Sequence, residues 1–347
     1  MTATLTPAPP VRPAARPSRR GLGLLAVAVV LAVVVLASLA LGARDIAPAD
    51  VVRALLAPVP GDADHAVVRD QRVPRTAVGL VAGAALGLAG TLMQGITRNP
   101  LADPGLLGVN AGSALFVVLA ITLLGVTSPA GFVWFALAGA ALAAALVYGI
   151  GSIGREGATP VKLALAGTAL TAGATSLITL VLITDEGTLS VYRRWSVGSL
   201  AGRGTDQLLA LAPFLLLGAL LALATGRTLN LLAMGDDVAR GLGQNLPLAR
   251  AAAATAIVLL AGSATALAGP VVFVGLVVPH LARPVTGPDY RWILPYALLL
   301  GPVVLVAADV LGRLVVRPGE LEAGIVVAVV GAPALIAIVR RTKLAGL

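Results

Sequence analysis

The stretch from Arg72 to Ala114 reads RVPRTAVGLVAGAALGLAGTLMQGITRNPLADPGLLGVNAGSA and decides the fold of this chain. It begins with two arginines around a proline and continues through a long run of apolar and small residues. The run stops at Asn99-Pro100 and Asp103-Pro104, where turn-forming residues replace the apolar ones, and a second apolar run follows. A run of about 20 apolar residues is long enough to cross a membrane as a helix. The stretch therefore predicts a transmembrane hairpin with arginines at its open end and a tight turn at the other.

The composition of the whole chain indicates a membrane protein. Of its 347 residues, 58% are hydrophobic and 12% are charged, and the mean hydropathy is +0.96, whereas soluble domains are about 25% charged. With 0 cysteines and 2 histidines, the chain offers no thiolate site, and we expect it to bind no metal or other cofactor. Its lysines, Lys162 and Lys343, do not stand in a phosphate-binding loop. No paired-carboxylate or serine–histidine pattern stands out, so we expect neither catalytic residues nor an enzyme.

Apolar runs recur along the chain and predict an all-α, polytopic membrane protein. With the N-terminus inside, 15 of the 25 Lys and Arg residues fall inside, in agreement with the positive-inside rule. An even number of spans then places both termini in the cytoplasm. Residues 1–20 are expected to form a disordered cytoplasmic tail, and residues 21–342 a transmembrane domain. A secretory or twin-arginine signal is the alternative for the N-terminus, although its apolar run exceeds the core of a signal. The ten expected spans are roughly 21–42, 76–96, 106–125, 131–152, 161–183, 207–225, 251–269, 271–284, 292–312 and 321–339.

Small residues recur at every fourth position of the second expected span, at Gly79, Gly83 and Gly87. Such spacing lets helix backbones approach closely and predicts an interhelical packing seam. The alternative is that a chain rich in glycine and alanine produces the spacing by chance. After this span, Asp103 is expected to cap the next helix, with Pro104 in its first turn.

Hydroxyl side chains form a stripe on the fifth expected span. Thr168, Thr171, Thr175 and Thr179 fall within about 80° of one another around a helix. The stripe predicts a hydrated translocation path that carries almost no fixed charge. The alternative is that the hydroxyls only bond back to carbonyls of their own helix.

A polar segment at residues 235–247 lies in a predicted cytoplasmic loop. It resembles the coupling segment of ATP-binding-cassette permeases, in which an acidic residue and an alanine precede a glycine. The matching residues are Asp237, Ala239 and Gly243, with Gly235 and Asp236 just before them. A short rigid helix of this kind can transmit the closure of an ATPase as a push. The alternative is an ordinary amphipathic loop helix.

The C-terminal third carries several further motifs in a fixed order. They are Gly269-Pro-Val-Val-Phe-Val-Gly-Leu-Val-Val-Pro-His280, Ala308-Asp309-Val-Leu-Gly-Arg313, Gly319-Glu-Leu-Glu-Ala-Gly324 and Gly331-Ala-Pro333. Together with the motifs of the opening stretch, they are similar to the permease family of bacterial importers for ferric siderophores, haem and vitamin B12. Within the family, NPLADPGLLGVNAG and GSATALAGPVVFVGLVVPHLAR resemble the D-type permease of the ferric enterobactin importer. The resemblance covers residues 21–342.

The resemblance implies a subunit of about ten helices in the bacterial inner membrane, paired with a second permease around a central path. The similarity to the D-type permease favours a paralogue over an identical copy as that second permease. Two ATPases would dock inside and an extracytoplasmic solute-binding protein outside, with membrane lipid as the surroundings and no role for nucleic acid. In the family, exposed arginines receive glutamates of the binding protein; the matching residues are Arg72, Arg75 and Arg313, and we expect Asp309 to pair with Arg313. The positions that correspond to the family's inner gate are Thr159 and Pro160. Relatives carry a hydroxyl residue at the position of Pro160.

The expected function is the transport of a ferric siderophore, energised by a separate ATPase. Haem or vitamin B12 is the alternative cargo within the same importer type. An ion-coupled secondary transporter is the alternative class, but it needs acids or histidines at mid-membrane. The expected spans contain Asp309, near a helix end, and we expect His280 to serve helix packing.

Overall fold

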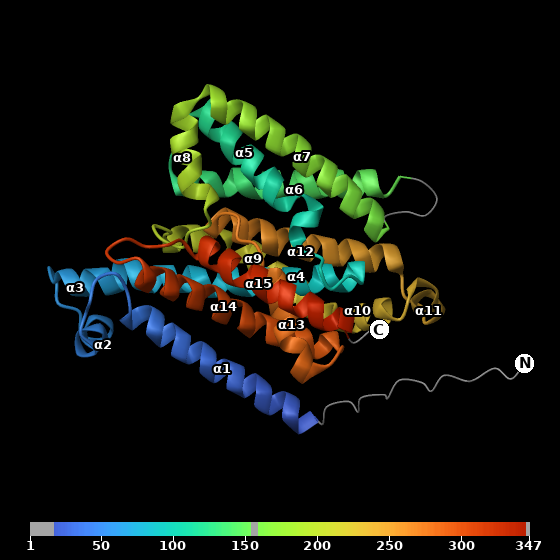
Figure 1. Ribbon diagram of the computed structural model, residues 1–347, viewed down its shortest axis with the longest axis horizontal. Helices are drawn as coiled ribbons and strands as arrows, with labels where there is room; N and C mark the ends of the chain where they lie inside the picture. The colour runs from blue at the N-terminus through green and yellow to red at the C-terminus, as the bar shows by residue number, and fades with distance from the viewer. Residues whose placement is uncertain (1–16, 154–158, 345–347) are drawn as a thin grey trace, which may run out of the picture.

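The computed structural model describes residues 17–153 and 159–344, and this part of the chain is helical without strands. Most helices run side by side along the long axis of the molecule (Figure 1). The helices are α1 Pro17–Ala40, α2 Pro48–Leu56, α3 Ala63–Ala66, α4 Val73–Thr97, α5 Val109–Leu124, α6 Pro129–Gly151, α7 Pro160–Thr184, α8 Glu186–Ser196, α9 Thr205–Ala224, α10 Gly226–Ala233, α11 Asp236–Gly241, α12 Leu246–Ala268, α13 Val274–Thr286, α14 Tyr290–Val315 and α15 Ala323–Leu344.

Each of the ten expected spans coincides with one of these helices, which confirms the all-α, polytopic class. Within residues 17–153 and 159–344, seven helices are long and apolar enough to cross a membrane, and shorter apolar stretches occur at Val109–Leu124 and Ala323–Ala337. The eighth expected span corresponds to α13, which has 13 residues. Residues 17–20 of the expected tail form the start of α1, because the helix extends beyond the apolar run. Residues 1–16 of that tail lie outside the described part.

Helix α4 lies at the centre of the molecule, and its glycines form the expected packing seam. A Cβ atom at Gly83 would lie 2.6 Å from the carbonyl oxygen of Gly301 in α14, and one at Gly87 equally close to that of Ala297. Gly90 meets Gly275 of α13 even more closely. The seam is therefore real, and it includes Gly90, which lies one position off the strict four-residue spacing.

The turn between α4 and α5 follows the expected turn chemistry. The Asp103 carboxylate accepts a hydrogen bond of 2.8 Å from the backbone N–H of Gly105. Pro104 begins a single 3-10 turn, Pro104–Leu107, and Gly108 with φ +71° leads into α5. The expected cap is confirmed, but α5 begins three residues later than the expected span because this turn comes first.

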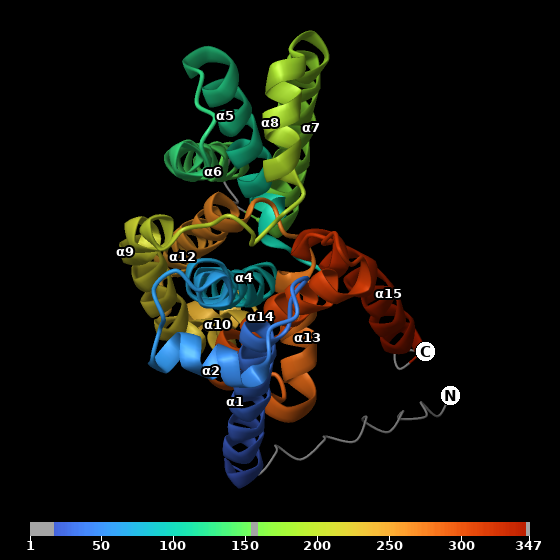
Figure 2. The same ribbon diagram turned by 90° about the vertical axis from the view of Figure 1, so that its left-hand side faces the viewer.

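Two groups of helices are visible when the molecule is viewed along the helices (Figure 2). Helices α5, α6, α7 and α8 form one group, which contacts the rest mainly where α6 packs on α12. Helices α4, α12, α13 and α14 form the buried core. Helix α9 packs on α12 and α4 at one side of it, and α1 covers it on the side opposite the first group. We call the end that carries α2, α3 and α8 the α2 end, and the opposite end the α11 end (Figure 1).

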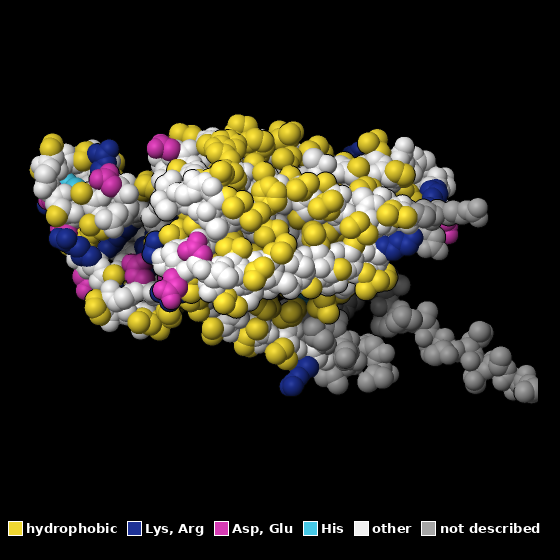
Figure 3. All heavy atoms as spheres, turned by 90° about the horizontal axis from the view of Figure 1, so that it is seen from above, with side chains coloured by type: hydrophobic (Ala, Val, Ile, Leu, Met, Phe, Trp, Pro, Cys, Tyr) yellow, Lys and Arg dark blue, Asp and Glu magenta, His cyan; other side chains and the backbone are white. Residues whose placement is uncertain are grey.

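Charge separates clearly from the apolar surface. In Figure 3 the middle of the visible face is apolar or uncharged, and charged side chains gather at the α2 end and at the α11 end. A surface of this kind suits an apolar membrane interior between two aqueous faces. The two ends therefore hold the candidate functional residues.

Candidate functional site

Helix α11 projects at the α11 end, and a glycine sets its direction. Gly235, with φ +105°, forms the sharp turn between α10 and α11 and occupies the N-cap position. Gly243, with φ +81°, forms the turn that leads back towards α12. Both backbone conformations are strained for other residues. The side chain of Ala239 is fully buried and fixes one face of α11 against the protein.

The two acids at the start of α11 have different environments. Asp236 pairs with Arg98 at the end of α4, at 2.9 Å, and with Arg250 in the first turns of α12, at 2.8 Å. The Asp237 side chain is 98% exposed and pairs with Arg240 of its own helix. Asp236 therefore anchors α11 to two core helices, whereas Asp237 faces outward. Sequence analysis missed Arg98, which follows an apolar span at the end of α4, and Arg250, which lies in the first turns of α12.

At the α2 end, two arginines bind the end of α1. Arg72 donates hydrogen bonds to the carbonyl oxygens of Leu39, at 2.9 Å, and Ala40, at 2.7 Å. Arg313 donates to the carbonyl oxygen of Ser38, at 2.9 Å, and to its hydroxyl, at 2.7 Å. The last carbonyls of a helix have no partners within the helix, so these guanidinium groups cap it.

The third arginine joins α4 to α14. Arg75 binds the Asp309 carboxylate through Nε and Nη2, at 3.0 and 2.8 Å, and Glu320 through Nη1, at 2.6 Å. Asp309 also pairs with Arg313 at 2.8 Å, as expected. Arg72 and Arg313 are 4% and 2% exposed. The expectation of exposed arginines is therefore wrong for this chain, because carboxylates and helix-end carbonyls already engage them; docking to a partner remains a prediction.

The threonine stripe lies on the free side of α7. Thr168, Thr175 and Thr179 are exposed and Thr171 is half-buried, whereas the opposite face packs on α5 and α6. The Thr168 hydroxyl donates to the carbonyl oxygen of Leu165, at 2.9 Å, and that of Thr179 to Thr175, at 2.8 Å. These bonds are the ones that the alternative interpretation expects, yet each hydroxyl oxygen can still accept from water.

The expected inner gate begins α7. The Thr159 hydroxyl accepts a hydrogen bond from the backbone N–H of Lys162, at 3.4 Å, and caps the helix. Pro160 occupies the first turn of the helix, and its side chain, like residues 154–158 before it, lies outside the described part. The gate therefore remains a prediction.

His280 makes a hydrogen bond between Nδ1 and the carbonyl oxygen of Leu276, one turn earlier in α13, at 2.8 Å. That contact agrees with the expected packing role. A neighbouring polar pair was not expected: Arg283 donates to Gln94 Oε1 at 2.8 Å and joins α13 to α4. Gln94 is itself buried within α4. An amide side chain in an otherwise apolar span was therefore the sequence feature that could have predicted this pair.

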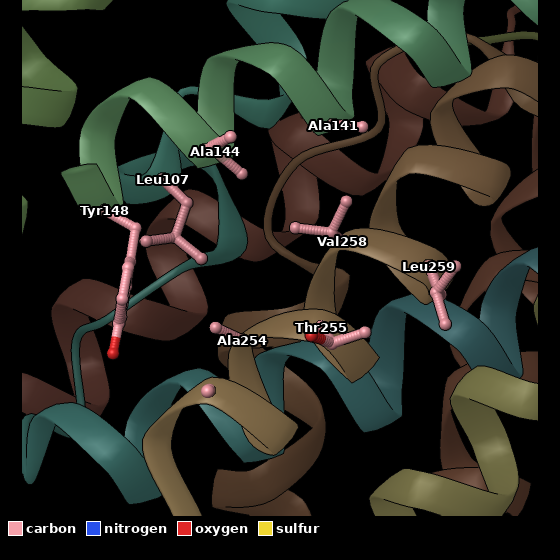
Figure 4. Close-up of a pocket in the computed structure, with 10 residues that line it drawn as sticks. Leu107, Ala141, Ala144, Tyr148, Ala254, Thr255, Val258 and Leu259 are labelled. Atoms are coloured by element: carbon pink, nitrogen blue, oxygen red, sulfur yellow. The ribbon is translucent and has the colours of Figure 1, made fainter. Parts of the chain in front are cut away.

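An apolar cavity of about 390 Å³ lies between α6 and α12 (Figure 4). Leu107, Ala144, Val258 and Leu259 form much of its wall, and the hydroxyl of Tyr148 and that of Thr255 add its few polar atoms. No charged side chain lines it among the described residues. A wall of this composition accepts hydrocarbon, such as a lipid acyl chain, and disfavours a charged cargo.

Comparisons with known proteins agree with this architecture. The chain is 44% identical to the siderophore transport system permease protein YfiZ of Bacillus subtilis, over 81% of this chain and 84% of the relative. It is 45% identical to the ferric enterobactin transport system permease protein FepD of Escherichia coli, over 89% and 92%. A metal-chelate type ABC transporter in an inward-facing conformation superposes with a TM-score of 0.78 at 27% identity, over 92% of this chain and 99% of that one. The match to the FecCD transport family spans residues 30–341; the chain therefore belongs to the FecCD transport family.

Proposed function

We propose that this chain is the membrane permease subunit of a binding-protein-dependent ABC importer that moves a ferric siderophore across the bacterial inner membrane. The observation that carries the proposal is α11, a short helix that projects from the protein and is tied to two core helices through Asp236. A projecting helix with a rigid base can pass a partner's movement to the helices behind it. The similarity to siderophore permeases supports the cargo class.

In the proposed topology, the α11 end faces the cytoplasm and the α2 end faces outward. The start of α1 and the end of α15 both lie at the α11 end, which supports two cytoplasmic termini. Two ATPases would bind around α11, and a solute-binding protein would bind at the α2 end. The chain itself would hydrolyse no ATP.

A second permease, favoured to be a paralogue, would complete the path. The free side of α7 carries the threonine stripe and exposed apolar residues such as Leu165 and Leu180, which suits a surface that another subunit covers in part. The stripe would then border the path between the two subunits, where hydroxyl groups hydrate the route without holding the cargo tightly. Thr159 and Pro160 would stand at its inner end.

Reconstituted transport tests the proposal. Liposomes that contain this chain with its partner permease and ATPase should accumulate a ferric siderophore only when ATP and the binding protein are supplied on the correct sides. Liposomes without the ATPase are the matched control. Accumulation in that control, or accumulation driven by a proton or sodium gradient, would contradict the proposed function.

A further inference from the structure

A second cavity, of about 440 Å³, opens at the α2 end beside α8. Its wall comes from α8, from the loop between α8 and α9, and from the beginnings of α6 and α15. Five of the ten residues that line it are polar or charged, whereas the cavity between α6 and α12 has no charged residue in its wall among the described residues. The polar and aromatic residues that matter here are Thr127, Arg194, Trp195, Ser199, Arg203 and Glu322.

The loop that forms this wall is held by close backbone contacts. Gly198, with φ +72°, presents its carbonyl oxygen to the backbone N–H of Gly324 at the start of α15, at 2.8 Å. A Cβ atom at Gly269 would collide with the carbonyl oxygen of Trp195, so the end of α12 packs directly on the end of α8. The ends of α8 and α12 and the start of α15 therefore hold the wall of the cavity in place through these backbone contacts.

Arg203 is the unusual residue in this wall. It is 7% exposed, yet within the described part of the chain it makes a single, long hydrogen bond of 3.4 Å, from Nε to the carbonyl oxygen of Ser199. No carboxylate of the described residues forms an ion pair with it. Arg72 and Arg313, which are equally buried, are fully engaged by carbonyls or a carboxylate.

A guanidinium group that is held largely away from bulk water without an ion pair is costly. The nitrogens of Arg203 are not among the fully buried, unpartnered atoms of the described residues, so the group still reaches the cavity. Loss of hydration lowers the pKa of Arg203 to about 10, which still leaves it cationic at neutral pH. Arg194 adds a second positive charge to the wall and Glu322 one negative charge, so a positive surplus remains. An anion that enters the cavity would supply the ion pair that Arg203 lacks among the described residues.

We propose that this cavity is an entry site for an anionic ferric chelate, with Arg203 as the residue that binds its negatively charged oxygens. The proposal rests on the proposed function, which places the α2 end on the side from which cargo arrives. Catecholate dianions around ferric iron leave a net negative chelate, whereas hydroxamate monoanions leave a neutral one. The site should therefore select catecholate or carboxylate chelates over hydroxamate chelates.

The direct test is binding to the full chain in lipid nanodiscs, with ferric enterobactin as a catecholate probe and ferrichrome as a hydroxamate probe. Arg203→Gln should weaken binding of the catecholate probe by about tenfold or more, because a charge-assisted hydrogen bond is worth about 1.5–3 kcal/mol. Arg203→Lys should keep most of the affinity. Arg193→Gln is the matched control, since Arg193 is exposed on α8, beside the cavity but outside its wall, and it should change nothing.

Glu322→Gln gives a second, opposite readout that does not depend on how Arg203 variants fold. Removal of the one acid should tighten binding of the catecholate probe. The proposal is overturned if Glu322→Gln and Arg203→Gln both leave its affinity unchanged, or if ferrichrome responds equally. It is also overturned if Arg203→Gln weakens only the binding protein's affinity, since Arg203 would then serve docking.

Transport assays separate this proposal from the proposed function. If the wild-type complex imports no ferric chelate with ATP, the proposed function fails. If it imports ferric enterobactin and ferrichrome alike, and Arg203→Gln slows neither, the proposed importer function is supported and the proposed entry site is contradicted.

Discussion

The Arg75 guanidinium donates hydrogen bonds to the Asp309 carboxylate through two nitrogens, at 3.0 and 2.8 Å, and so joins α4 to α14 at the α2 end. Asp309 is 1% exposed and also pairs with Arg313. The same two helices pack backbone to backbone deeper in the membrane at Gly83 and Gly301. The ion pair thus holds, at the α2 end, a helix pair whose middle is held by close packing.

Asp309→Asn is expected to destabilise the chain strongly, because two arginines would lose their buried partner. Removal of one member of a buried ion pair costs about 3–5 kcal/mol. Thermal unfolding in detergent would measure the loss. Asp45→Asn is the control, since Asp45 is 85% exposed and pairs with Arg317 at the surface, where a pair is worth about 0–1 kcal/mol. Equal shifts for the two variants would contradict this role of Asp309.

Gly83→Val should prevent normal packing of α4 on α14. A Cβ atom there would lie 2.6 Å from the Gly301 carbonyl oxygen, and a backbone atom cannot move aside as a flexible side chain can. We expect a large loss of folded, monodisperse protein in size-exclusion chromatography. Gly149→Val in α6 is the matched control, because a Cβ atom there meets nothing within 4 Å. Normal yield of the Gly83 variant would show that the seam tolerates separation.

Sequence analysis predicted this seam, the hairpin turn and every long helix, because those features depend on local patterns of apolar, small and turn-forming residues. It did not predict the burial of Arg72 and Arg313, because their partners are backbone carbonyls at the end of α1, which no side-chain pattern reveals. It also grouped Asp236 with Asp237. Adjacent positions on a helix face different directions, but only the packing of the helix decides which of them faces the protein. Tertiary contacts, not composition, separate an anchor from an outward-facing residue.

Asp236→Ala is expected to loosen α11, because the helix would lose its ion pairs with Arg98 and Arg250 and keep only the contact of Ala239. Hydrogen exchange of the α11 backbone should accelerate by about tenfold or more, given about 1–3 kcal/mol for the lost charged hydrogen bonds. Transport-coupled ATP hydrolysis in the assembled complex should fall with it. Asp237→Ala should leave the exchange of α11 unchanged, since that side chain reaches only Arg240 of its own helix. Unchanged exchange in the Asp236 variant would remove its anchoring role.

Removal of hydroxyl groups from the threonine stripe can distinguish a hydrated translocation path from hydroxyls that only bond to their own helix. Thr175→Val and Thr179→Val keep the shape of the side chain and remove the hydroxyl, so a hydrated path would lose two hydrogen-bonding groups. We expect transport by the double variant to slow by about tenfold, because a net hydrogen bond is worth about 0.5–1.5 kcal/mol. Thr184→Val is the control, because Thr184 bonds to carbonyls of its own helix but lies off the stripe. If the hydroxyls serve only their own helix, the Thr175, Thr179 and Thr184 variants and the double variant should all transport at the wild-type rate. A loss confined to the stripe would assign it to the path, since removal of an intrahelical hydrogen bond affects Thr184 and Thr179 alike.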